Sequence, residues 1–190
     1  MAMEYFRPAM AASDDKILVD MSCATGLFTR RFAKSGNYKR VLGCDYSQSM
    51  LQEARRRILS EQGELSPSKT RLELVRLDVG QIPMQNNSID ALHAGAAMHC
   101  WPDLPKAVSE IYRVLKKGGR AYFSTFLSSY FATLRTLNNG ESASEPSAQA
   151  FQYFASVDEL RQLLLDGGFE PDKIVIEVIG NACVVIRCEK

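Results

Sequence analysis

The sequence predicts an α/β fold with a doubly wound, mainly parallel sheet and an antiparallel C-terminal hairpin. Apolar runs of strand length alternate with helical patterns over 16–126, which is typical of parallel strands joined by crossover helices. Three of these runs are followed at once by an aspartate: Asp20, Asp45 and Asp78. Near the carboxyl end, two runs flank Gly180-Asn181, a pair suited to a tight hairpin turn.

The first strand is expected at 16–20, because Ile17, Leu18 and Val19 form a run typical of a strand buried on both faces. Thr25 is a candidate N-cap for a helix over 26–34. The helix residues expected to face the sheet are Leu27, Phe28 and Phe32. A short helix with weak periodicity is expected over 4–12.

The second strand is expected at 40–44, followed by a helix that Ser47 caps. The apolar stripe of this helix consists of Met50, Leu51, Ala54 and Ile58. Its three consecutive arginines are interpreted as a solvated face. The third and fourth strands are expected at 71–77 and 88–94.

Asp103 is expected to cap a helix that Gly118-Gly119 end before a fifth strand at 120–126. The buried stripe of this helix is Leu104, Ala107, Val108, Ile111 and Leu115. Ser156 and Glu159 form a capping box that opens a helix to Asp166. The last two strands are expected at 173–179 and 182–187.

The whole chain, 1–190, is expected to form a single domain. Residues 1–15 are expected to be a short or truncated N-terminal segment. Residues 127–155 are rich in polar and turn-forming types, which fits either a lid over a pocket or a disordered insert. Their composition leaves both alternatives open.

Composition narrows the classes of partner. The net charge of +1 gives no overall field to attract nucleic acid, and no apolar run is long enough to span a membrane. The five cysteines are scattered, without C-x-x-C spacing, and are interpreted as reduced, buried thiols of an intracellular protein. No metal site is predicted.

The turn after the first strand is the first candidate site. Its residues are small: Ser22, Cys23, Ala24, Thr25 and Gly26. Small side chains let backbone amides approach a ligand at a helix N-terminus, on the carboxyl edge of the sheet. The alternative is an ordinary strand-to-helix loop, because Gly26 is the only glycine in it.

The aspartates at the strand ends extend this candidate site. Asp45 follows Gly26 by about 20 residues, the spacing at which an acidic side chain accepts hydrogen bonds from ribose hydroxyls. The Asp78 carboxylate suits an exocyclic amine, and the amide of Val79 suits a ring nitrogen. Any one of these aspartates is also compatible with a simple loop position.

Four ordered segments resemble the class I S-adenosylmethionine-dependent methyltransferases, particularly the ubiquinone/menaquinone-biosynthesis group and its plant plastid-targeted members. They are V-D-M-S-C-A-T-G-L-F, V-L-G-C-D-Y-S-Q-S-M-L, L-D-V-G-Q-I-P-M-Q-N-N-S-I-D-A-L and E-I-Y-R-V-L-K-K-G-G-R. The resemblance covers about 17–126. It implies a seven-stranded sheet with an antiparallel final strand, S-adenosylmethionine as cofactor and, for the plastid-targeted members, a chloroplast location.

The resemblance also implies roles for particular residues. Asp20 and the turn formed by Ser22, Cys23, Ala24 and Gly26 would hold the methionine moiety of the cofactor. Asp45 would bind the ribose, with Tyr46 beside the adenine and with Asp78 and Val79 at the adenine edge. Members of the family carry glycine where this chain has Ser22 and Ala24, which is expected to weaken cofactor binding.

Two residues after the fourth strand are candidates for the acceptor side of the site. His99 is a weak candidate general base, with pocket shaping as the alternative. Trp101 is expected either to stack on an aromatic acceptor or to pack in the core. His93 is interpreted as structural, and Cys100 lacks a partner that would activate it as a nucleophile.

The leading hypothesis is therefore a methyltransferase that acts on a small-molecule acceptor. The main alternative is a catalytically silent cofactor-binding domain with the same fold. A nicotinamide dehydrogenase is disfavoured because the G-x-G-x-x-G register is missing.

Overall fold

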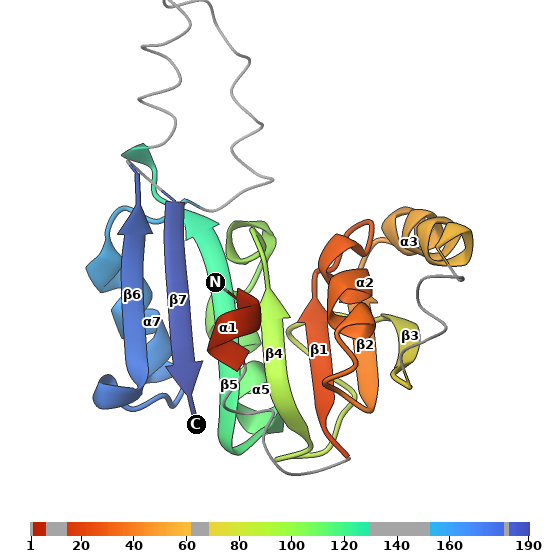
Figure 1. Ribbon diagram of the computed structural model, residues 1–190. Coiled ribbons are helices and arrows are strands. Elements are labelled where there is room, and N and C mark those ends of the chain that lie inside the picture. Colours follow the sequence, from red (N-terminus) through yellow and green to blue (C-terminus); the bar gives the residue numbers. More distant parts are fainter. Residues whose placement is uncertain (1, 7–14, 62–68, 130–152, 181–182) are drawn as a thin grey trace, which may run out of the picture.

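The computed structural model describes residues 2–6, 15–61, 69–129, 153–180 and 183–190. Within these ranges the chain forms a seven-stranded sheet with helices on both faces (Figure 1). The predicted fold class is confirmed. The segments 7–14 and 130–152 lie outside the described residues, so the rest of the first predicted helix and the lid-or-insert alternative stay open.

The strand order across the sheet is β3-β2-β1-β4-β5-β7-β6. All neighbours pair in parallel except β7, which is antiparallel to both β5 and β6. The strands are β1 (Ile17–Met21), β2 (Arg40–Asp45), β3 (Arg71–Arg76), β4 (Ile89–Ala94), β5 (Leu115–Phe126), β6 (Ile174–Ile179) and β7 (Cys183–Glu189). The chain adds β2 and β3 on one side of β1 and then returns to add β4 and β5 on the other side. In open α/β sheets, ligands bind at such a switch point, outside the carboxyl ends of the strands.

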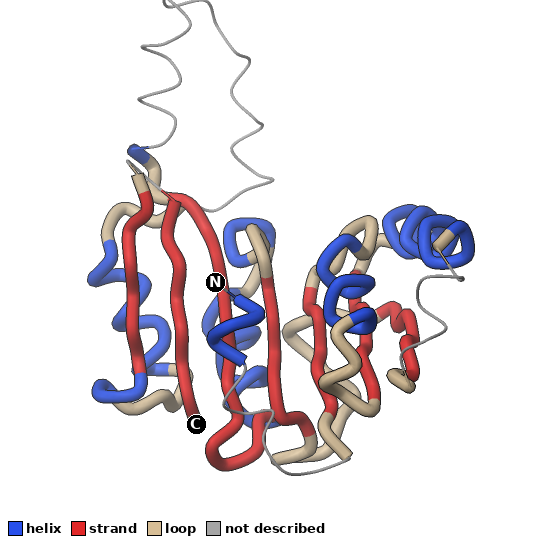
Figure 2. Tube along the Cα trace, viewed as in Figure 1, coloured by secondary structure: helices blue, strands red, loops and turns tan. Residues whose placement is uncertain are grey.

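Helices cover both faces of the sheet (Figures 1 and 2). In front of the sheet lie α1 (Ala2–Phe6) and α2 (Leu27–Lys34), and behind it lie α5 (Leu104–Val114) and α7 (Val157–Asp166). Two short 3-10 helices, η2 (Met98–Cys100) and η3 (Pro171–Lys173), follow β4 and precede β6. Near the edge strand, α3 (Gln48–Ser60) packs against β2 and β3. No helix among the described residues is long and apolar enough to cross a membrane.

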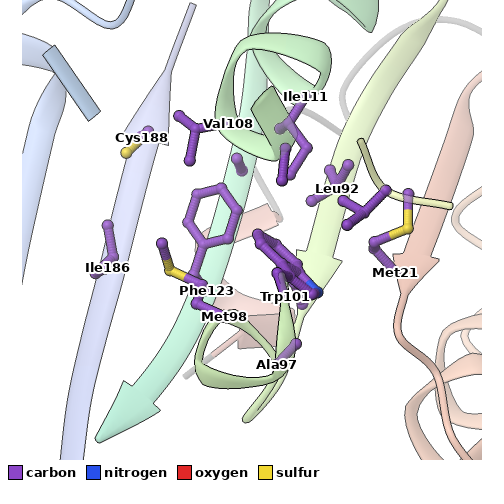
Figure 3. Close-up of a cluster of buried hydrophobic side chains, with 14 of the residues drawn as sticks. Met21, Leu92, Ala97, Met98, Trp101, Val108, Ile111, Phe123, Ile186 and Cys188 are labelled. Atoms are coloured by element: carbon purple, nitrogen blue, oxygen red, sulfur yellow. The ribbon is translucent and has the colours of Figure 1, made fainter. Parts of the chain in front are cut away.

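The core has two layers, one on each side of the sheet. Behind the sheet, the stripe predicted for α5 is buried against β4, β5 and β7, with Trp101 and Phe123 in the same cluster (Figure 3). In front of it, Phe6 and Phe32 pack with Leu18, Val41 and Tyr122. Burying these side chains removes apolar surface from water, which stabilises the fold by about 25 cal/mol per Å².

Three of the predicted helix caps are confirmed. The Ser47 hydroxyl accepts from the Met50 amide at 3.4 Å, and the Asp103 carboxylate accepts from the Lys106 amide at 3.0 Å. At α7 the Ser156 hydroxyl accepts from the Glu159 amide, while the Glu159 carboxylate accepts from the Ala155 amide. Each bond satisfies an amide that the helix leaves without an internal partner.

The prediction for α2 was wrong in two respects. Gly26 in the left-handed region, rather than Thr25, precedes the helix, and no side chain caps it. Leu27 remains 44% exposed, whereas Phe32 is fully buried as predicted and Phe28, although 37% exposed, contacts the His93 ring on β4. The polar Thr29 is also fully buried on this helix, because its hydroxyl donates to the buried carboxylate of Asp20 on β1.

Gly118-Gly119 do not end a helix, contrary to the prediction. The backbone leaves the helical region at Leu115, and β5 begins there. Gly118 adopts a left-handed conformation, and its amide donates to the Lys190 carbonyl. The glycines thus lie in the irregular first part of β5, where the register of β5 against β4 shifts.

Candidate functional site

The residues of the candidate site lie at the carboxyl edge of β1, β2, β3 and β4. The turn 22–26 leaves β1, Asp45 ends β2 and Asp78 follows β3. Cys44 pairs with Met21 on one side and with Val75 on the other, so these strand ends lie next to one another. The sheet therefore brings the predicted turn and aspartates to one edge.

The turn after β1 keeps left-handed backbone at three positions. The φ angles of Ser22, Ala24 and Gly26 are 54°, 48° and 72°. A hydrogen bond from the Gly26 amide to the Cys23 carbonyl closes the turn, and the Cys23 amide donates to Cys44 on β2. Glycine reaches these φ angles readily but serine and alanine do not, so this turn holds two strained residues.

Asp45 links the turn to β2. One of its oxygens accepts from the Ala24 amide and the other from the Ser47 amide, both at 2.8 Å. Each carboxylate oxygen has two lone pairs, so Asp45 can still accept hydrogen bonds from a ligand diol. It therefore orders the turn and keeps the acceptor capacity that a ribose needs.

Tyr46 presents an exposed ring beside Asp45. Its exposed fraction is 69%, and the Arg76 guanidinium lies 5.5 Å from its ring centroid. Arg76 also donates to the Tyr46 carbonyl at 3.0 Å. Arg76 steadies the ring from one side, a role that sequence reasoning missed because only the register of β2 against β3 brings the two residues together.

Asp78 and Val79 lie in a tight turn after β3. The Asp78 carboxylate accepts from the Gly80 amide at 2.8 Å, and the backbone of Asp78 pairs with Gln81. Val79 is buried. The predicted pair is therefore held by its own turn at the same edge of the sheet as Asp45, and its contact with an adenine stays a prediction.

Asp20 lies within β1, two residues before the turn begins. Its side chain is buried, with one oxygen 2.7 Å from His93 Nδ1 and the other accepting from the Thr29 hydroxyl at 2.5 Å. A carboxylate only accepts, so His93 Nδ1 carries the hydrogen of its bond. Asp20 thus ties α2 and β4 to β1, and its predicted contact with the methionine moiety stays a prediction.

His93 has the structural role that the sequence indicated, and its partners explain why. Its ring packs against Phe28, Phe32 and Tyr122. A Cβ on Gly95 would lie 2.9 Å from the ring, so glycine is needed there. Thr29 is the network member that the sequence did not reveal, because no local pattern shows that its hydroxyl meets Asp20.

His99 lies on η2, in contact with the end of β5. Its Nδ1 is 3.4 Å from the Thr125 hydroxyl, and its ring contacts Phe126 and stacks on Tyr153. Partial burial lowers the pKa of His99 below its ordinary value, because the charged imidazolium loses hydration. The neutral imidazole is therefore favoured, as a general base requires, and this role stays a prediction.

Trp101 packs in the core, the second of its two expected positions. The indole is 3% exposed and lies against Phe123 in an edge-to-face contact (Figure 3). Its Nε1 donates to the Ser22 hydroxyl at 2.9 Å. This geometry does not favour a stacking contact with an acceptor and instead connects Trp101 to the turn.

Burial disfavours the reactive thiolate at four of the five cysteines, and the fifth, Cys183, is half-buried rather than buried as expected. Cys23, Cys44 and Cys188 are buried, and burial raises the pKa of each thiol. Cys100 is exposed, contrary to the expectation of buried thiols, yet its pKa is also raised. Within the described part of the chain, no group of cysteine, histidine and acidic residues is placed to hold a metal ion.

The arrangement fits an adenosyl group. Asp45 offers carboxylate acceptors to a diol, and Tyr46 offers an exposed ring face next to them. The turn keeps left-handed backbone at Ser22 and Ala24, the two positions where the family that the sequence resembles carries glycine. The residues expected at the adenine, the ribose and the methionine moiety thus lie along one edge of the sheet in that order, at the ends of β3, β2 and β1.

Comparison with protein families decides the assignment. A family profile described as a methyltransferase domain matches residues 19–123, more than half of the chain. The chain belongs to this family. The matched region contains the turn, Asp45, Asp78 and η2, so the candidate site of this methyltransferase domain lies wholly within it. S-adenosylmethionine is the cofactor that the family implies.

Relatives of the methyltransferase domain are longer proteins. An uncharacterized chloroplastic methyltransferase of Arabidopsis thaliana is 44% identical over 127 residues, which is 67% of this chain and 34% of the relative. A demethylmenaquinone methyltransferase of Symbiobacterium thermophilum is 37% identical over 63% of this chain and 43% of the relative. The chain thus spans about a third of the Arabidopsis relative and less than half of the bacterial one.

Solved structures confirm the fold of the methyltransferase domain. A methyltransferase of Methanosarcina mazei has a TM-score of 0.71 at 22% identity, with 94% of each chain covered. The [4+2]-cyclase SpnF has a TM-score of 0.66 at 22% identity, covering 92% of this chain and 57% of that one. A cyclase among the neighbours illustrates that this fold alone does not specify the reaction.

Proposed function

We propose that this protein is an S-adenosylmethionine-dependent methyltransferase that acts on a small-molecule acceptor. The observation that carries the proposal is the position of Asp45, which orders the turn through the Ala24 amide and retains acceptor capacity for a ribose. The family assignment supports the same ligand. The demethylmenaquinone methyltransferases among the relatives support a small-molecule acceptor.

The cofactor supplies an activated methyl group. The chain therefore has to bind the cofactor and the acceptor, orient them toward one another and exclude water from the site. Asp45 would bind the ribose hydroxyls, and Tyr46 would cover one face of the adenine. Asp78 and Val79 would meet the adenine edge. The turn from Ser22 to Gly26 would bind the methionine moiety with its backbone.

His99 would act as a general base toward the acceptor. A neutral imidazole on η2 could remove the proton of an acceptor hydroxyl as the methyl group is transferred. The burial that lowers the pKa of His99 keeps it in the required form near neutral pH. An acceptor that is already ionised would need no base. The loss of methyl-transfer activity when His99 is replaced would therefore indicate whether the acceptor has to be deprotonated.

Calorimetric titration with S-adenosylmethionine and S-adenosylhomocysteine tests the proposal. We expect one site per chain for each ligand. No binding at millimolar ligand would reject the proposed cofactor. Methyl release from radiolabelled cofactor, with a panel of quinols, phenols and carboxylic acids as acceptors, then tests catalysis.

A cofactor-binding domain without catalysis is the alternative that Ser22 and Ala24 favour. Each adds side-chain atoms and backbone strain to the turn. Cofactor binding without methyl release across the acceptor panel would support this alternative. Release with any acceptor would eliminate it.

We also propose a plastid location for the natural protein. Two Arabidopsis relatives, 44% and 40% identical to this chain, are chloroplastic. Immunodetection in fractionated cells that express the natural gene would test this. A signal confined to a non-plastid fraction would reject it.

A further inference from the structure

The turn that would hold the methionine moiety contains two non-glycine residues in left-handed backbone. The φ angles are 54° at Ser22 and 48° at Ala24. This conformation costs roughly 1–2 kcal/mol per residue for most side chains, so the turn would relax unless other contacts held it. Those contacts must come from outside the turn.

Each strained residue has a long-range hydrogen bond. The Ala24 amide donates to Asp45 on β2 at 2.8 Å. The Ser22 hydroxyl accepts from the Trp101 indole N–H at 2.9 Å, across 79 residues of sequence. Both ends of the strained segment are therefore anchored to neighbouring parts of the sheet edge.

Trp101 is a rigid anchor. Its ring is buried in the core behind the sheet, among Met98, Ala97 and Phe123 (Figure 3). A buried indole N–H without an acceptor would be costly, so the ring and the serine hydroxyl stabilise one another's positions. The bond uses the atom that serine has and glycine lacks.

We propose that Trp101 is a positioning residue for cofactor binding, which acts through the Ser22 hydroxyl and not through contact with the acceptor. The inference rests on the proposed function, because it assigns the turn to the cofactor. It explains how a turn with serine in place of glycine keeps a binding-competent shape. It also replaces the acceptor-stacking role considered for Trp101.

Three variants test the proposal by calorimetry with S-adenosylhomocysteine. Trp101→Phe removes the donor but keeps an aromatic ring, and we expect binding to weaken about tenfold because the strained turn loses its anchor. Ser22→Gly removes the strain and the acceptor together, and we expect a smaller loss. The double variant should bind within about threefold of the wild type, since neither the strain nor the unpaired N–H remains.

Ile111→Val provides the control for a general loss of core stability. Ile111 is fully buried in the same hydrophobic cluster, on α5 behind the sheet. We expect this variant to lower the unfolding midpoint without changing the affinity for S-adenosylhomocysteine. If Trp101→Phe behaves like Ile111→Val, Trp101 is only a core residue and the proposal is overturned.

Steady-state kinetics separate a positioning role from acceptor stacking. With a working acceptor, we expect Trp101→Phe to raise KM for S-adenosylmethionine and to leave KM for the acceptor unchanged. A rise confined to the acceptor KM would overturn the proposal in favour of stacking.

The wild-type titration distinguishes this inference from the proposed function. If the wild type binds no S-adenosylhomocysteine, the proposed function fails and the inference falls with it. If the wild type binds and all three variants match it, the inference alone is overturned.

Discussion

The Asp45 carboxylate accepts a hydrogen bond from the Ala24 amide at 2.8 Å, although Asp45 is the last residue of β2 and Ala24 lies in the turn after β1. The bond joins the turn after β1 to the end of β2. The side chain proposed to bind the ribose is thereby part of the framework that shapes the turn proposed to hold the methionine moiety. Changes at Asp45 should consequently affect ligand contact and turn geometry together.

Asp45→Asn should weaken S-adenosylmethionine binding by at least about tenfold. Asparagine has one acceptor oxygen, so it cannot accept from both the Ala24 and Ser47 amides and still serve a ribose. Calorimetry measures the loss. Asp103→Asn is the matched control, since asparagine caps helices about as well as aspartate and should leave the affinity unchanged. Equal affinities for both variants would contradict the ribose role.

Gly26→Ala should destabilise the fold by about 2 kcal/mol or more, judged by urea unfolding. The new Cβ would lie 3.1 Å from the Ala54 Cβ on α3, in addition to the strain of the left-handed backbone. Gly36→Ala separates the two effects, because Gly36 has a φ of +67° and no atom within 4 Å of the added Cβ. We expect Gly36→Ala to cost less. A cost equal to that of Gly26→Ala would show that packing against α3 is unimportant.

Thr29→Val should destabilise the protein by about 1–3 kcal/mol, because a buried Asp20 oxygen loses its hydroxyl donor while the side-chain shape is kept. Chemical denaturation measures the change. Thr29→Ser retains the hydroxyl and should recover most of the stability. If the serine variant is the less stable of the two, the methyl group matters more than the hydrogen bond.

The pH dependence of stability should carry a contribution from His99. Its folded-state pKa lies below the ordinary value of 6.5, so the unfolded chain binds the proton more readily. The favourable contribution is fully present above pH 6.5 and is lost as the pH falls through the folded-state pKa. The stability of the wild type relative to His99→Asn should therefore decrease between pH 8 and pH 5, as followed by thermal unfolding. A pH-independent difference would contradict the burial effect.

The methyl-transfer rate offers a second measurement on His99. With an acceptor hydroxyl that needs deprotonation, the wild-type rate should stay flat near pH 7 and fall as the imidazole takes up a proton. The His99→Asn rate should be lower and should lack this fall. A pH profile common to both proteins would assign the proton transfer to another group.

Local sequence patterns identified most of the helices and strands and their order along the chain. Runs of apolar residues marked the strands, and short-range capping signals at Ser47, Asp103 and Ser156 were sufficient because each cap bonds within its own first turn. The prediction failed where a distant partner decides the outcome. Thr29 faces inward because Asp20 lies beneath it, and β5 starts early because Lys190 and β4 pair with its first residues.

The sequence by itself determined the α/β class, the strand ends that carry Asp45 and Asp78, and the small-residue turn. These depend on residue type and on spacing along the chain, which a single sequence displays. Only the tertiary structure decided that Asp20 is enclosed by His93 and Thr29, that Arg76 steadies Tyr46, and that Trp101 bonds to Ser22. Those relationships depend on strand order and side-chain direction, which bring together groups far apart in sequence and which no local pattern encodes.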